Sequence, residues 1–77
     1  DTRLPSTICD ISQRGVKMIC SAKIAVHSNI LIRAADRRPV TATVKWRGGD
    51  YLGAEFHRLM PIEELVTWMG DDQPAAS

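Results

Sequence analysis

Residues 40–56, VTATVKWRGGDYLGAEF, decide the fold. From Val40 to Arg47 apolar and polar side chains alternate, as in a strand with one face toward a core and the other toward solvent. Residues 48–50 interrupt this pattern, and glycines ahead of a second β-rich run are typical of a tight hairpin turn. Residues 51–56 then return as a second strand. The stretch predicts an antiparallel hairpin with Trp46 on the apolar, inward face.

Shorter β-rich runs precede this hairpin. Leu4 to Ser12 and Val16 to Cys20 read as two strands, and the tight link at residues 13–15 predicts that they pair as a second hairpin. Asn29 to Ala34 reads as a further strand, whereas residues 21–28 fit either a strand or an extended loop. The turn DRRP at residues 36–39 is expected to be solvated.

One helix is expected after the strands, from Pro61 to Met69. Proline fits the first position of a helix, and Gly70 is expected to end it. An apolar stripe should cover the barrel, formed by residues at helical spacing: Ile62, Leu65, Val66 and Met69. Trp68 lies off this stripe, at the barrel rim or on a contact surface.

A chain of 77 residues has room for one domain. Short strands, hairpin turns and one terminal helix predict a mainly β protein, a small antiparallel β-barrel with one C-terminal helix. We expect the barrel and helix to span residues 1–70, and residues 71–77 to form a flexible tail.

Composition narrows the function. The formal net charge is +1, without the basic excess of a general nucleic-acid binder, so no DNA partner is expected. No apolar run approaches the ~20 residues of a membrane span, and no signal-peptide pattern opens the chain. Cys9 and Cys20 are expected to be reduced and semi-buried. These features predict a cytoplasmic protein without membrane insertion.

No catalytic or metal-binding pattern stands out. His27, His57, Cys9 and Cys20 lack the spacing of a zinc site. No general acid and base occur at a recognisable spacing. We therefore expect a protein that is not an enzyme, with no metal and no cofactor.

The candidate site is the segment DISQRG at residues 10–15. Asp10 can accept hydrogen bonds from the N–H groups of a guanine, and Ser12 can donate or accept. Arg14 can meet a phosphate or stack on a base, and Gly15 lets a ligand approach the backbone. The alternative is an ordinary turn, in which the Asp and Ser side chains bond local amides.

The wider order of motifs resembles the PilZ domain family. The Asp-x-Ser-x-x-Gly segment at residues 10–15 is followed by NILI at 29–32, VKW at 44–46 and GAEF at 53–56. The resemblance covers roughly Leu4 to Met69. It implies a split, six-stranded antiparallel barrel that binds cyclic di-GMP on its outer surface. It also implies that the residues matching the family's motif, Asp10, Ser12 and Gly15, contact a guanine.

One family element is not found in these 77 residues: either it lies upstream of Asp1, or the chain is a degenerate PilZ-like domain. The Arg-x-x-x-Arg motif that precedes the barrel in the family has no match upstream of Asp10, where Arg3 stands alone and is kept as a candidate ligand residue. Two hypotheses follow. The chain is a cyclic di-GMP receptor that relays ligand state to a partner protein or adjacent domain, or it is a degenerate PilZ-like adaptor that binds protein and no nucleotide. A homo-oligomer is compatible with both.

Overall fold

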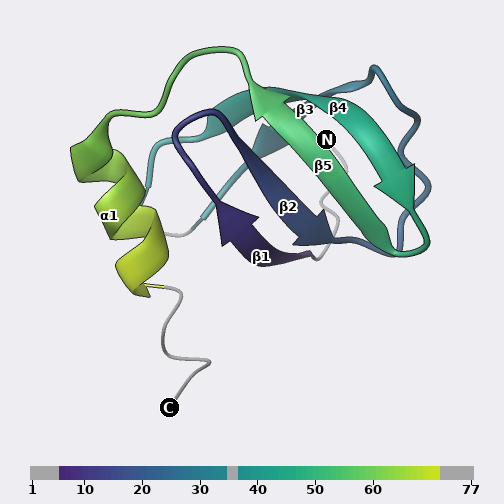
Figure 1. The fold of residues 1–77 in the computed structure, drawn as a ribbon, viewed down its shortest axis with the longest axis horizontal. Helices are drawn as coiled ribbons and strands as arrows, with labels where there is room; N and C mark the ends of the chain where they lie inside the picture. The colour runs from purple at the N-terminus through teal and green to yellow at the C-terminus, as the bar shows by residue number, and fades with distance from the viewer. Residues whose placement is uncertain (1–5, 35–36, 72–77) are drawn as a thin grey trace.

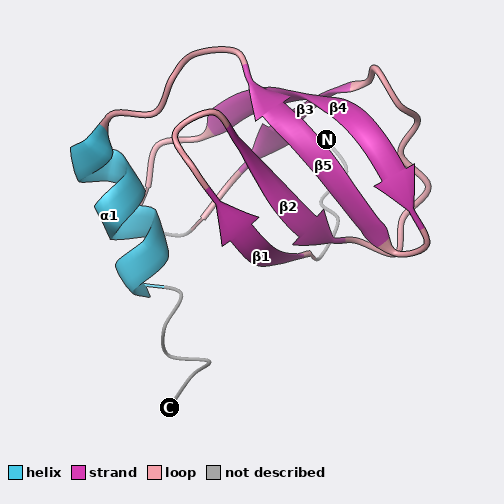
Figure 2. Cartoon of the chain, viewed as in Figure 1, coloured by secondary structure: helices cyan, strands magenta, loops and turns pink. Residues whose placement is uncertain are grey.

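The computed structural model describes residues 6–34 and 37–71. Within these residues the protein is mainly β, a single antiparallel sheet curled into a half-barrel with one helix at its end (Figures 1 and 2). This confirms the predicted fold class. The elements in chain order are β1 (Thr7–Ile11), β2 (Gly15–Ile19), β3 (Asn29–Ile32), β4 (Val40–Gly48), β5 (Tyr51–Phe56) and α1 (Ile62–Asp71).

The sheet order is β1-β2-β5-β4-β3, so β5 lies between its hairpin partner β4 and β2, and this pairing joins the β1–β2 hairpin to the rest of the sheet. Every pair of neighbouring strands is antiparallel. β1 and β3 are the edges of the sheet within the described residues, which contain five strands rather than the six that the family resemblance implies. The curl leaves an inner face for the core and an outer face toward solvent.

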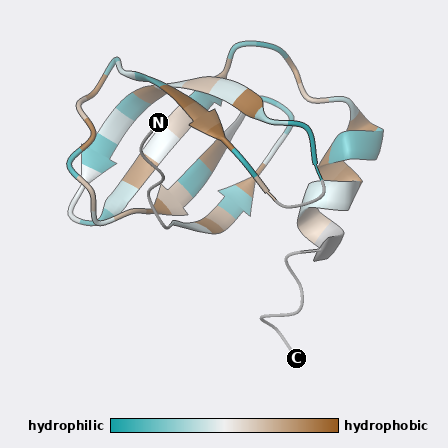
Figure 3. Ribbon diagram, turned by 180° about the vertical axis from the view of Figure 1, so that it is seen from behind, coloured by the Kyte–Doolittle hydropathy of each residue, from teal (hydrophilic) through white to brown (hydrophobic). Residues whose placement is uncertain are grey.

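The core fills the inner face. Along β2, β4 and β5, buried apolar side chains alternate with outward ones, which Figure 3 shows as alternating brown and teal bands. The hairpin of residues 40–56 supplies the most buried part, including Val44 and Leu52 with no exposed surface. The other buried members are Val16, Met18, Cys20, Ile32, Ala42, Ala54, Phe56, Met60 and Trp68.

The prediction that Trp46 lies in the core is wrong. Val44 pairs with Ala54, but Trp46 pairs with Gly53, so β4 carries one extra residue at this point, a β-bulge. A bulge shifts the alternation of side chains by one position. Trp46 is therefore turned to the outer face, where 45% of its surface is exposed.

Trp68 takes the core position instead. Its side chain is 3% exposed, and Leu65 on the same side of α1 is half-buried against the core. The guanidinium of Arg37 lies 5.5 Å from the centre of the Trp68 ring, and its Nη2 donates a hydrogen bond to the Thr67 carbonyl. Arg37 thus ties the β3–β4 connection to α1, so the prediction of a solvated turn is wrong for this residue.

Of the predicted apolar stripe, only Leu65 packs against the barrel, so the prediction is wrong for Ile62, Val66 and Met69. Ile62 and Val66 are more than 60% exposed, because Trp68 and Leu65 already occupy the contact with the core. The helix also runs through Gly70 to Asp71, so the prediction that Gly70 ends it is wrong. Residues 72–77, most of the predicted flexible tail, lie outside the described residues.

Three smaller findings complete the fold. Residues 21–28 form a loop rather than a strand, and Arg47 holds this loop by donating hydrogen bonds to the carbonyls of Ala22 and Ile24. Both cysteines are free, but Cys9 is exposed rather than semi-buried, whereas Cys20 is buried. Among the described residues, no helix has the length and apolar character to cross a bilayer.

Candidate functional site

Ser12 shapes the corner between β1 and β2. Its backbone N–H donates to the Gly15 carbonyl at 2.9 Å, and its Oγ accepts from the N–H groups of Arg14 and Gly15, both at 3.3 Å. The hydroxyl oxygen thus accepts hydrogen bonds from two backbone N–H groups of the tight turn that would otherwise bond only to water. Ser12 is exposed, so the corner faces solvent as the site hypothesis requires.

These hydrogen bonds show that Ser12 has a structural role whatever it binds. Replacing Ser12 with alanine removes the acceptor for two turn amides. We expect the free energy of unfolding to fall by about 1 kcal/mol, the usual cost of losing such a side-chain bond to the backbone. Urea denaturation of the Ser12→Ala variant measures this loss, and an unchanged midpoint would show that the hydroxyl does not stabilise the turn.

Gly15 is required by packing against β5. A Cβ at this position would collide with the carbonyl oxygen of Ala54, a backbone atom that cannot move aside alone. The residue pairs with Glu55, and the neighbouring Arg14 carbonyl accepts from the Phe56 N–H. The glycine therefore allows close approach of two strands, and its lack of a side chain also leaves bare backbone on the outer face.

A second bulge sets the direction of Asp10. Ile8 pairs with Met18 but Asp10 pairs with Lys17, so Cys9 is the extra residue on β1. In a strand with regular alternation, Asp10 would share the inward face of Ile8, two residues before it. With the extra residue, Asp10 is exposed on the outer face opposite Lys17. Bulges near functional sites often re-aim a side chain in this way.

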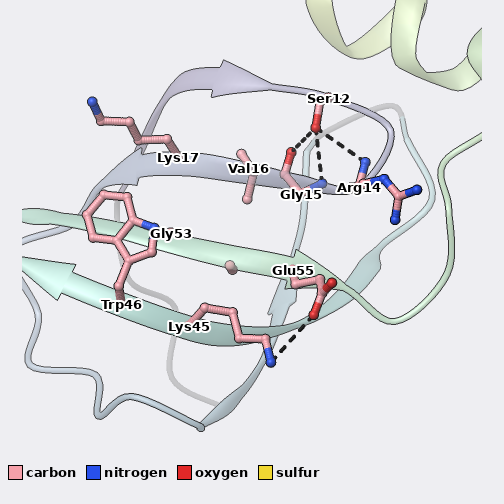
Figure 4. A pocket seen from close by; sticks show the side chains of 10 residues that line it. Ser12, Arg14, Gly15, Val16, Lys17, Lys45, Trp46, Gly53 and Glu55 are labelled. Atoms are coloured by element: carbon pink, nitrogen blue, oxygen red, sulfur yellow. Dashed lines mark hydrogen bonds and ion pairs between the residues drawn. The ribbon is translucent and has the colours of Figure 1, made fainter.

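Trp46 lies over Gly53 in the middle of this outer face. A Cβ at Gly53 would overlap the indole Nε1, so the ring occupies the space that a side chain on β5 would fill (Figure 4). On its other side, Gly53 pairs with Lys17 of the neighbouring strand β2. The two bulges thus bring Asp10 and Trp46 to one face, at either end of a row formed by Asp10, Lys17, Gly53 and Trp46.

A shallow, open hollow of about 350 Å³ lies on this face. Gly15 leaves room for it, because β2 places no side chain at this position, and the Trp46 ring over Gly53 forms part of its lining. It is lined by residues of three strands and the β1–β2 turn: Ser12, Arg14, Gly15, Val16, Lys17, Lys45, Trp46, Gly53, Ala54 and Glu55. Figure 4 shows Lys17, Lys45 and Arg14 spread around its rim.

The rim carries three cations and one anion. Lys45 Nζ lies 3.5 Å from the Glu55 carboxylate in an exposed pair, which contributes little stability. The Lys17 ammonium lies 4.9 Å from the centre of the Tyr51 ring, a cation–π distance. An exposed indole beside cationic side chains suits a ligand that combines a flat base with phosphate.

The predicted site residues fall into three groups. Ser12, Arg14 and Gly15 line the hollow together. Asp10 shares the outer face but lies outside the lining, and Arg3 lies outside the described residues. Reasoning from alternation placed Trp46 in the core and so missed it as a site residue. A glycine in one strand of a hairpin and a tryptophan in the other are a signal for an indole that packs over the glycine backbone. Within the described residues, no three His, Cys, Asp or Glu side chains gather as a metal site would need.

Comparison with known proteins adds no relative. No family model matches the chain, and neither the curated proteins nor the solved structures compared with it include a match.

Proposed function

We propose that the chain is a PilZ-type, non-catalytic regulatory module that binds cyclic di-GMP on the outer face of its half-barrel. One observation carries the proposal. The Asp-x-Ser-x-x-Gly corner, the tryptophan of β4 and the glycine of β5 are far apart in sequence, yet they meet on one solvent-facing surface. These are three of the four segments that carry the sequence resemblance to the PilZ family; the fourth is residues 29–32.

In this proposal the hollow holds one guanine and a phosphate. This guanine stacks on the exposed face of Trp46, whereas the Asp10 carboxylate, at the other end of the row of paired residues, would accept from the N–H groups of the second guanine of the ligand. Arg14 or Lys17, at opposite ends of the hollow, would meet the phosphate oxygens with charge-assisted hydrogen bonds. Glu55 opposes an anionic ligand, and its pairing with Lys45 reduces this repulsion.

The module relays ligand state without chemistry of its own. Its partner is a protein or an adjacent domain that senses whether the outer face is covered. Binding that orders a segment across such a face is a common switching mechanism. For the 77-residue chain itself, in which Arg3 is the one arginine upstream of Asp10, we expect a dissociation constant on the order of 10 µM.

Calorimetric titration with cyclic di-GMP tests the proposal. Trp46→Ala should weaken binding about 10-fold, because stacking on an aromatic ring is worth about 1–3 kcal/mol per base. Asp10→Ala should also weaken it, through loss of the guanine contact. Leu31→Ala, on the outward side of the edge strand β3, is the control and should bind as the unaltered protein does.

The outcome that refutes the assignment is equally specific. If Trp46→Ala, Asp10→Ala and Leu31→Ala all bind with unchanged affinity, the ligand does not use this hollow. If the unaltered protein gives no heat up to about 1 mM ligand, a concentration at which even binding of about −4 kcal/mol is detected, the receptor hypothesis fails.

The second hypothesis, an adaptor that binds protein and no nucleotide, has one observation in its favour. The outward apolar side chains of α1 and the segment before it are not needed to cover the core. An adaptor would bind protein at this surface with an empty hollow. The titration separates the two functions, since the adaptor gives no heat with cyclic di-GMP.

A further inference from the structure

Four exposed arginines lie along one end of the sheet, the end nearest α1 (Figure 1). In the antiparallel order β2-β5-β4-β3, the start of β2, the end of β5, the start of β4 and the end of β3 all fall at this end. Within two residues of each of these strand ends stands one arginine, and the four form an arginine row: Arg14, Arg58, Arg38 and Arg33.

Backbone hydrogen bonds hold the strand ends of this row side by side. The Arg14 carbonyl accepts from the N–H of Phe56, the last residue of β5, at 2.8 Å. The next residue, His57, donates to the Thr41 carbonyl of β4 at 3.0 Å, and β4 pairs with β3 up to the last residue of β3. Neighbouring strands are about 5 Å apart, so the row crosses about 15 Å of the sheet end.

No carboxylate neutralises the arginine row. Within residues 6–34 and 37–71, none of its four guanidinium groups forms an ion pair, whereas Lys45 pairs with Glu55 on the outer face. Arg37, between two members of the row in sequence, is instead held against α1 by Thr67 and Trp68. The row therefore presents positive charge that the fold itself does not use.

The distribution of charge along the sequence explains why the net charge hides this feature. Residues 6–58 contain nine Lys and Arg against four Asp and Glu, a formal charge of +5. Residues 59–77 contain four acidic residues and no basic one. The net charge of +1 thus averages a basic sheet with an acidic C-terminal part, so it is no guide to what the sheet binds.

The type and arrangement of these residues favour a single strand of nucleic acid. A guanidinium group binds two phosphate oxygens at once, and its plane stacks on an unpaired base. Arg14 also lines the hollow, so one end of the row opens onto the exposed indole of Trp46, a second place for a base to stack. A single strand is narrow enough to follow a row that is one residue wide.

Broader anionic partners fit this end of the sheet less well. The helix that packs there, α1, has Glu63 and Glu64 in its first turn, and a flat lipid surface touching the row would also approach these carboxylates. Helices that lie on anionic lipid carry lysine and arginine instead. Duplex DNA is read by a helix or a β-ribbon that enters a groove, and the row presents neither.

We propose that the arginine row binds the phosphates of a single-stranded nucleic acid, whose chain continues past Arg14 into the hollow. This is a ligand class beyond cyclic di-GMP. Three of the four arginines lie outside the hollow, and the contact needs no particular base. A base stacked on Trp46 would exclude cyclic di-GMP, so the two ligands should compete.

The test uses the full 77-residue protein and labelled oligo(U) and oligo(dT) of about 12 nucleotides, followed by fluorescence anisotropy. Binding should be saturable and should weaken with salt, with a log–log slope of about −3 for four phosphate contacts. Arg38→Gln and Arg58→Gln should each weaken binding about 5-fold at low salt and reduce the slope by about 0.7.

Lys23→Gln is the matched control. It removes the same charge from an exposed position in the loop that Arg47 holds, at the opposite end of β4, and should leave the slope unchanged. Tighter binding of oligo(U) would identify RNA as the ligand, and tighter binding of oligo(dT) would identify DNA. Both results support the arginine row, provided that the row variants weaken binding and Lys23→Gln does not.

Three outcomes overturn the inference. The first is no binding of either oligomer at about 1 mM protein. The second is an equal effect of Arg38→Gln and Lys23→Gln, which would show only general attraction of charge. The third is equal or tighter binding of a duplex, of polyglutamate or of anionic vesicles, which would identify another partner. The row variants lie outside the hollow, so a failure of cyclic di-GMP to bind would not alter these readouts.

Discussion

Replacing Trp68 with alanine should lower the free energy of unfolding by about 3–5 kcal/mol, the usual cost of removing a large aromatic side chain from a core. Trp68 is 3% exposed and joins α1 to the barrel, and the Arg37 guanidinium lies against its ring. The loss is a large share of the stability of so small a domain. We expect the variant to be largely unfolded at 37 °C, as measured by circular dichroism and urea denaturation.

The other tryptophan supplies the matched control. Trp46→Ala should cost about 1–2 kcal/mol, clearly less than Trp68→Ala, since nearly half of the side chain is exposed and the inner face is unaffected. The two substitutions remove the same atoms, so the difference between them measures position alone. Equal losses, or a larger loss for Trp46, would contradict the assignment of Trp68 to the core and of Trp46 to the outer face.

Replacing Gly15 with alanine should destabilise the protein by about 2–3 kcal/mol, at the upper end of the range for overpacking. The added Cβ meets the Ala54 carbonyl, and β2 and β5 must separate to admit it. These strands pair over five residues in the middle of the sheet, so the strain cannot be released at an edge. Urea denaturation of Gly15→Ala measures the effect.

Gly48→Ala is the control for this prediction. A Cβ at Gly48 meets nothing within 4 Å, so the change should alter the free energy of unfolding by less than about 0.5 kcal/mol. If Gly15→Ala is tolerated equally well, the close approach of β2 and β5 is not a constraint on the sequence. The glycine of the Asp-x-Ser-x-x-Gly motif would then need another explanation.

The period-two patterns were sufficient to predict the strands. The hairpin of residues 40–56 has the expected tight turn, although Gly48 belongs to β4 and the turn consists of Gly49 and Asp50 alone. Gly49 adopts a positive φ of 60°, which glycine tolerates well. β5 has the predicted bounds, and β2 and β3 differ from theirs by one and two residues at their ends. Alternation over several residues is a strong signal because one face of each strand must be buried.

The same reasoning could not locate the bulges. After a bulge, the side chains of a strand point to the opposite faces, but the pattern of residue types in the sequence does not show where this happens. Strict alternation therefore placed Trp46 inward. The extra residue at Cys9 has the corresponding effect on Asp10. In the helix, the spacing of apolar residues indicated an apolar face that is wider than the surface the barrel can cover. The spacing could not show which of these residues would be buried. Packing around Trp68 and Arg37 decided that.

The residues that line the hollow were therefore predicted in part. The turn residues Ser12, Arg14 and Gly15 were identified from their types and spacing, and they line the hollow. The lining residues Lys17, Lys45 and Glu55 were not identified, because the sequence does not show which residues of other strands lie beside a charged residue of a strand. Their convergence depends on the register of β2, β5 and β4, which is a property of the folded sheet.

The most direct test of the central claim is a titration of the ¹⁵N-labelled protein with cyclic di-GMP, followed by amide chemical shifts. We expect saturable shifts at residues 10–17, 45–46 and 53–55, and a large shift of the Trp46 indole N–H, with α1 unchanged. Absence of shifts at millimolar ligand, or shifts that leave the β1–β2 corner and Trp46 unaffected, would contradict a nucleotide site on this face.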